Sequence, residues 1–172
     1  CAHLGGGLLT LPRALAAARP GSSQRVIELE PALVHLVADR FGLPEGVEVE
    51  VADARAWIIT AAPASWDAVT VDVFAGGRIP AAFTSLEFYG AVRDALRPDG
   101  TLVVNSVAGP ELDYTRRQLA TLRTLFEHVG MIVQGSALHG ARFGNATLLA
   151  SAAPLDVEAI RGALRGHPSK GA

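Results

Sequence analysis

Cysteine, aromatic residues and long uncharged stretches are all scarce in this chain of 172 residues. The only cysteine is Cys1, which excludes an intrachain disulfide and a metal site built on cysteines. A chain with one cysteine is compatible with a reducing compartment, so we expect a cytoplasmic protein. The five histidines show no ligand spacing, and the sequence therefore predicts no metal site.

An excess of basic charge is also missing. Fifteen lysines and arginines stand against 17 acidic residues, for a net charge of −2. Without a basic excess to neutralise phosphates, we expect no nucleic-acid partner. The longest uncharged run lies between Glu127 and Arg142 and is interrupted by glycines, so it falls short of the ~18 residues that a membrane-spanning helix needs. We therefore predict no membrane segment in this chain.

The composition is that of a globular domain, with 49% hydrophobic and 19% charged residues. The length suits one hydrophobic core, so we predict a single domain over residues 1–165 and a frayed tail over 166–172. Residues 1–4 read as the end of a buried strand. We therefore expect a further segment before Cys1 in the whole protein.

Short apolar runs alternate with helical patterns along the whole chain. The first strand ends at Leu4. Further strands are predicted over 25–29, 47–51, 66–74 and 101–107, and helices over 11–18, 31–41, 54–60, 84–96, 112–129 and 156–164. Residues 131–134 and 146–151 resemble a closing antiparallel pair. This order predicts an α/β fold with a doubly wound, mainly parallel, Rossmann-like sheet and a terminal antiparallel strand pair.

Three glycines, Gly5, Gly6 and Gly7, follow the first strand. Glycines permit a sharp turn and the close approach of a ligand, and the next helix offers N–H groups to an anionic ligand end. The alternative is a tight strand–helix turn without a ligand. Ligands of doubly wound sheets bind at the carboxyl ends of the strands, which favours the first interpretation.

Acidic residues follow the next three strands. Glu28 and Glu30 end the second strand, about twenty residues after the glycines, where a carboxylate can accept bonds from ribose hydroxyls or simply be solvated. Asp53, followed by Ala54, can accept from an adenine amino group or cap the next helix. Asp72 lies in an apolar run, where it is a general base with a raised pKa or a structural aspartate.

The order and spacing of these pieces resemble the spermidine synthase-like family, which shares the class I S-adenosylmethionine-dependent methyltransferase fold. The matching strings are Leu4-Gly5-Gly6-Gly7, Glu28-Leu29-Glu30-Pro31, Asp53-Ala54, Asp67-Ala68-Val69-Thr70-Val71-Asp72, Glu87-Phe88-Tyr89 and Leu96-Arg97-Pro98-Asp99-Gly100. Residues 140–145 also resemble a distal loop of the bacterial branch.

The resemblance implies a role for each matched residue. The three glycines would lie against the amino-acid-like tail of S-adenosylmethionine or of decarboxylated S-adenosylmethionine. Glu28 would hold the ribose, and Asp53 with Ala54 would lie near the adenine. Asp72 would accept a proton from an attacking small-molecule amine. Independently of the resemblance, the apolar stripe of residues 112–129 predicts a core or homodimer surface rather than a cofactor box.

Two carboxylates of the family pattern are absent, since Leu8 and Ala75 stand in their places. Aminopropyl transfer to an amine is the leading hypothesis. Because Leu8 removes an acid that selects the amine-only tail, methyl transfer from S-adenosylmethionine is the second. A nucleoside-binding scaffold without an acceptor site is the third.

Overall fold

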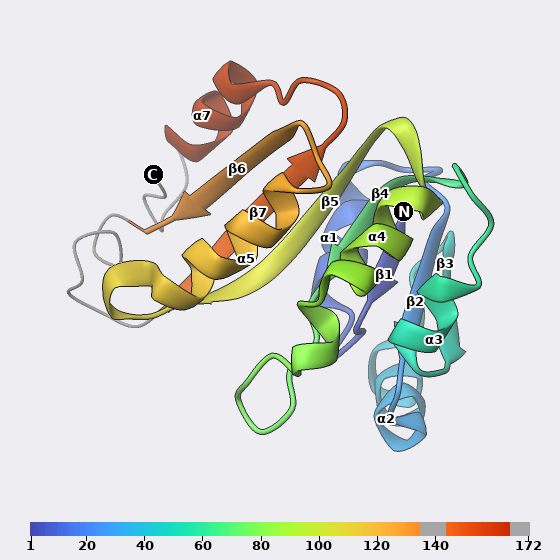
Figure 1. Ribbon diagram of the computed structural model, residues 1–172. Helices are drawn as coiled ribbons and strands as arrows, with labels where there is room; N and C mark the ends of the chain where they lie inside the picture. The colour runs from blue at the N-terminus through green and yellow to red at the C-terminus, as the bar shows by residue number, and fades with distance from the viewer. Residues whose placement is uncertain (135–143, 166–172) are drawn as a thin grey trace.

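The computed structural model of the chain describes residues 1–134 and 144–165. Seven strands form one sheet in the order β3-β2-β1-β4-β5-β7-β6 (Figure 1). The strands are β1 (Ala2–Leu4), β2 (Gln24–Glu28), β3 (Val47–Val51), β4 (Trp66–Val71), β5 (Leu96–Ala108), β6 (His128–Val133) and β7 (Gly144–Ser151).

The sheet is parallel from β3 to β5, and β7 runs antiparallel to both β5 and β6. The chain adds β2 and β3 on one side of β1 and then returns to place β4 on the other side. The strand order therefore reverses between β1 and β4, where such sheets bind their ligands. The predicted fold, with its terminal antiparallel pair, is confirmed.

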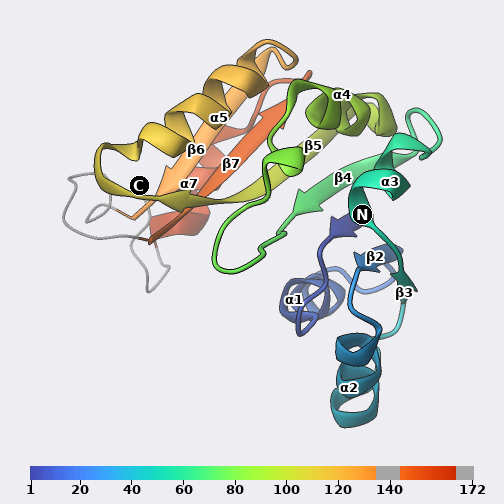
Figure 2. The same ribbon diagram turned by 60° about the horizontal axis from the view of Figure 1, so that its bottom comes forward.

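Helices cover both faces of the sheet. They are α1 (Thr10–Ala18), α2 (Pro31–Phe41), α3 (Ala54–Ile59), α4 (Leu86–Ala95), α5 (Asp113–Arg123) and α7 (Val157–Arg165). The larger core cluster packs α3, α4 and α5 against one face, and a smaller cluster packs α1 and α2 against the other (Figure 2). Short 3-10 turns, η1 (Ala81–Phe83) and η2 (Pro110–Leu112), precede α4 and α5. Among the described residues, no helix is long and apolar enough to cross a membrane.

Local sequence signals explain where several helices begin. Pro31 occupies the first turn of α2, and the Glu30 side chain accepts a bond from the Ala32 N–H. The Ser85 side chain accepts from the Phe88 N–H at the start of α4. These caps are short-range interactions, which is why the sequence located both helices closely.

The predicted helix over residues 112–129 is wrong in its last third. Helix α5 ends at Arg123, and His128–Val133 forms strand β6. Leu122 and Phe126 are still buried, as the helical spacing indicated. The residues after them pair one by one with β7, and the main-chain bonds of that pairing override the helical pattern.

Two strand boundaries also differ from the prediction. Strand β4 ends at Val71 rather than at residue 74. Strand β5 begins at Leu96 rather than at residue 101, with a register shift in the pairing of β4 and β5 beside Trp66. The predicted tail and most of the loop over 140–145 lie outside the described residues.

Candidate functional site

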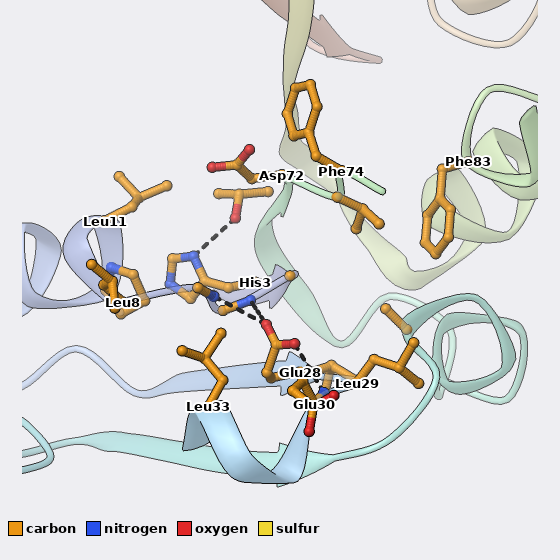
Figure 3. Close-up of a pocket in the computed structure, with 18 of the residues that line it drawn as sticks. His3, Leu8, Leu11, Glu28, Leu29, Glu30, Leu33, Asp72, Phe74 and Phe83 are labelled. Carbon is orange, nitrogen blue, oxygen red and sulfur yellow. Dashed lines mark hydrogen bonds between the residues drawn. The ribbon is translucent and has the colours of Figure 1, made fainter. Parts of the chain in front are cut away.

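A cavity of about 580 Å³ opens where the strand order reverses, at the carboxyl ends of β1, β2 and β4. It brings together all the residues that the sequence singled out for a site, as Figure 3 shows in part. They are Gly5, Gly6, Gly7, Glu28, Asp53, Ala54 and Asp72. The roles given to them remain predictions, but their convergence on one cavity is observed.

The glycine turn, Gly5 to Gly7, joins β1 to α1 under tight steric limits. Gly5 has a φ of +95°, and a Cβ there would lie 2.2 Å from the main-chain oxygen of Asp72. A Cβ on Gly6 would lie 2.8 Å from Cγ1 of Val26, whereas one on Gly7 would meet nothing within 4 Å. Close packing therefore demands glycine at the first two positions, and the third needs it only for its φ of +51°.

The carboxylate of Glu28 holds this turn in place. Its Oε2 accepts from the N–H groups of Gly6 at 2.9 Å and Gly7 at 3.0 Å, and its Oε1 accepts from Glu30 N–H at 3.0 Å. Partial burial acts to raise the pKa of Glu28, but the main-chain donors outweigh burial, so the pKa lies below its ordinary value. Glu28 is therefore an ionised acceptor with most of its lone pairs in use.

Asp53 caps the next helix, which is one of the two interpretations of the sequence, and the contact with adenine stays a prediction. Its Oδ1 accepts from the Ala56 N–H at 2.8 Å and caps α3, and the residue also lines the cavity. Its second oxygen accepts no bond from the part of the chain that the structure describes. Ala54 is buried beside it. Asp53 can thus cap its helix and still accept a bond from a ligand.

Asp72 lies at the cavity mouth, but not in the buried setting that the sequence predicted. Because β4 ends at Val71, Asp72 follows the strand and is exposed. Its Oδ1 accepts from Nδ2 of Asn105 on β5 at 2.8 Å. The prediction of a buried, shielded carboxylate is therefore wrong, because the strand end leaves the side chain open to solvent.

His3 and Thr70 form a polar pair at the floor of the cavity, and the sequence did not predict this pair. His3 is 1% exposed, and its Nδ1 lies 2.9 Å from Oγ1 of Thr70, while its Nε2 lies 2.9 Å from Oε1 of Gln24. Burial lowers the pKa of His3. The available signal was a histidine inside a buried strand, two residues before the glycine turn.

Apolar side chains complete the lining. Leu8, Leu11 and Phe74 are exposed and lie on either side of Asp72 at the mouth. Leu29 and Leu33 lie beside Glu28 and Glu30, and Phe83 lies apart from both groups (Figure 3). Within residues 1–134 and 144–165, no group of three histidine, cysteine, aspartate or glutamate side chains could hold a metal ion.

No family model matches the chain. It is 32% identical over 102 residues to a probable polyamine aminopropyl transferase of Bifidobacterium longum, a match covering 59% of this chain and 23% of that protein. It is also 28% identical over 127 residues to an N-terminal histidine N-methyltransferase of Emericella nidulans, covering 72% of this chain and 22% of that protein. The chain therefore spans less than a quarter of either relative.

Solved structures extend the likeness over nearly the whole chain. A probable spermidine synthase from Corynebacterium glutamicum matches with a TM-score of 0.92 and 34% identity, over 99% of this chain and 64% of that one. Human methyltransferase-like protein 13, solved with SAH, matches with a TM-score of 0.75 over 94% of this chain and 76% of that one. At 22% identity, the second match shows the fold alone.

The sheet order, the cavity at the strand reversal and these neighbours together define an α/β protein with the class I methyltransferase fold. Within that class, the chain is spermidine synthase-like, as the motifs between residues 4 and 107 predicted. Its relatives are named as transferases, one of methyl groups and one of aminopropyl groups.

Proposed function

We propose that the protein binds decarboxylated S-adenosylmethionine in this cavity and transfers the aminopropyl group of this donor to an amine. The observation that carries the proposal is the composition of the lining: the glycine turn, Glu28, Asp53 and the exposed Asp72 all face one cavity, with Glu28 and Asp72 apart from each other (Figure 3). One part of the cavity can therefore hold a nucleoside while another presents a base to an acceptor.

Glu28 is the group we assign to the ribose. Three N–H donors already occupy its oxygens, out of about four lone-pair sites on a carboxylate. One ribose hydroxyl can be accepted directly, and a second requires the exchange of a bond with the glycine turn. Donor binding would thus couple to the turn that lies against the donor's tail.

In the transfer step, the nitrogen of the acceptor attacks the carbon next to the sulfonium. A C–N bond forms, the C–S bond breaks, and sulfur leaves with the bonding pair as a neutral thioether, methylthioadenosine. The proton of the attacking amine passes to the Asp72 carboxylate. Positioning of the two reactants supplies the remaining catalysis.

Methyl transfer from S-adenosylmethionine is the second candidate, and the start of α1 favours it. Leu9 offers no side-chain cap, the first turn has no acidic residue, and Thr10 and Leu11 line the cavity. The uncapped N–H groups at this helix start favour an anionic ligand group. S-adenosylmethionine has such a group, its carboxylate, and the decarboxylated form lacks it.

Calorimetry on the full-length protein tests the proposal. S-adenosylmethionine, its decarboxylated form and methylthioadenosine are titrated, and at least one should bind. Glu28→Gln should weaken binding by about 1.5–3 kcal/mol, the range for a hydrogen bond to a charged group. Glu45→Gln, an exposed change before the amino end of β3, is the matched control and should bind normally. Failure of all three ligands would refute the transferase proposal.

A further inference from the structure

The mouth of the cavity presents one carboxylate among exposed apolar side chains. Leu8 is 56% exposed, Leu11 47% and Phe74 40%, and all three line the cavity with Asp72. Leu8 and Leu11 lie on one side of Asp72, and Phe74 lies on the other (Figure 3). Large apolar side chains gathered at the rim of a binding cavity indicate a ligand with an apolar part.

The other carboxylates of the cavity each accept main-chain hydrogen bonds. Glu28 is bonded to the glycine turn, and Glu30 and Asp53 each cap a helix. The side chains next to Asp72 along the chain are those of Val73, Phe74 and Ala75, which also line the mouth. Among the described residues, Asp72 is therefore the lining carboxylate that accepts no main-chain bond.

The charge of Asp72 is also not neutralised by the lining. No lysine or arginine lines the cavity within the described part of the chain, and the recorded partner of Asp72 is the neutral amide of Asn105. One ammonium group can pair with this carboxylate. A second ammonium on the same ligand would meet leucine and phenylalanine side chains, which offer it no carboxylate partner and bind an apolar body better.

We infer that the acceptor is a primary monoamine with an apolar body, and not an aliphatic diamine. The inference rests on the proposed function and names the substrate class of the same site. The ammonium of the acceptor pairs with Asp72, gives it a proton and attacks as the free amine. Its alkyl or aromatic body lies between Leu11 and Phe74. As in the transfer step described above, a C–N bond forms while the C–S bond of the donor breaks. The inference holds equally if the donor transfers a methyl group.

The test compares n-butylamine, n-hexylamine and putrescine as acceptors for the full-length protein with each donor. Putrescine has the carbon chain of n-butylamine and one more nitrogen, so the pair isolates the second charge. We expect kcat/KM for n-butylamine to exceed that for putrescine by tenfold or more. n-Hexylamine should be better still, because burial of a CH₂ group is worth about fourfold.

Two substitutions that introduce an acidic side chain at the mouth should reverse the preference for monoamines over putrescine. Leu8→Asp and Ala75→Asp should each raise kcat/KM for putrescine at least tenfold and lower it for n-hexylamine. Both residues line the mouth and are exposed, so neither change disturbs the core. Ala152→Asp, an exposed change just after β7, is the matched control and should leave the preference unchanged.

The outcomes separate the two proposals. If a donor binds and putrescine is used as well as or better than n-butylamine, the acceptor inference is overturned and the transferase proposal stands. Donor binding without turnover of any of the three amines also overturns the acceptor inference. If no donor binds, the proposed function fails and the inference fails with it.

Discussion

At the scale of single residues, the site depends on two carboxylates with different surroundings. Glu28 is half-buried and accepts three main-chain bonds, whereas Asp72 is exposed and accepts one bond from Asn105. The first is suited to hold a ligand in a fixed place. The second keeps a free oxygen toward the mouth, so it can accept a proton from an incoming group.

Asp72→Asn should separate chemistry from donor binding. The amide keeps the shape of the side chain but cannot accept the proton, and loss of a general base costs about 10²–10⁴-fold in rate. Donor affinity should be retained, since the Asp72 side chain bonds to Asn105 and makes no hydrogen bond to Glu28 or to the glycine turn. Steady-state rates with an accepted amine and calorimetry with the donor check the two parts. Parental turnover in Asp72→Asn would contradict the role of Asp72.

At the scale of elements, the glycine turn connects three strands to the first helix. The Gly5 N–H donates to the Ile27 carbonyl at 2.9 Å, and the Asp72 N–H donates to the Leu4 carbonyl at 2.9 Å. The turn therefore sets the spacing of β1, β2 and β4 at the cavity. Its geometry decides where the predicted ligand-binding groups lie.

Gly5→Ala should be far more harmful than Gly7→Ala. A Cβ on Gly5 would collide with a main-chain oxygen, and this backbone cannot move without displacing β4. A Cβ on Gly7 meets no neighbour, so its cost is the ~1–2 kcal/mol of a left-handed residue. Urea unfolding of both variants measures the difference. Similar free energies of unfolding would show that the turn tolerates a side chain at Gly5.

At the scale of the whole molecule, a buried polar chain crosses the centre of the sheet. His3 on β1 bonds to Gln24 on β2 and to Thr70 on β4. It thus links the two halves of the sheet at the strand reversal, directly below the cavity. Because Oε1 of Gln24 accepts, Nε2 of a neutral His3 carries the proton and Nδ1 accepts from Thr70.

This arrangement predicts a loss of stability in mild acid. The folded-state pKa of His3 is lowered by burial from its ordinary 6.5, so protonation favours the unfolded chain. Above pH 6.5 the group contributes no pH dependence. Below it, the unfolded chain takes up the proton first, and the free energy of unfolding falls by up to about 1.4 kcal/mol per pH unit until the folded pKa is reached.

Urea unfolding of the parent and of His3→Gln between pH 8 and pH 5 measures this effect. The glutamine side chain of the variant carries no charge at any of these pH values, so the free energy of unfolding of the variant should fall less steeply below pH 6.5. NMR titration of the His3 ring in the folded parent is a second readout that needs no substitution. A midpoint at or above 6.5 would contradict the prediction.

The sequence alone determined the α/β alternation, the class of sheet and which residues at the ends of its strands would line one cavity. These features follow from local patterns: apolar periodicity, caps such as Ser85, and glycines at a turn. In a parallel sheet, strand ends share one edge, so acids that are distant in sequence could be expected to converge there.

Only the tertiary structure decided how those residues are used. Residues 128–133 became a strand because β7 was available to pair with them. Asp72 is exposed because β4 ends early, and Asn105, 33 residues later, holds it. Glu28 is bonded to main-chain groups 21 and 22 residues earlier in the chain. Each outcome depends on contacts between segments far apart in sequence, which no local pattern encodes.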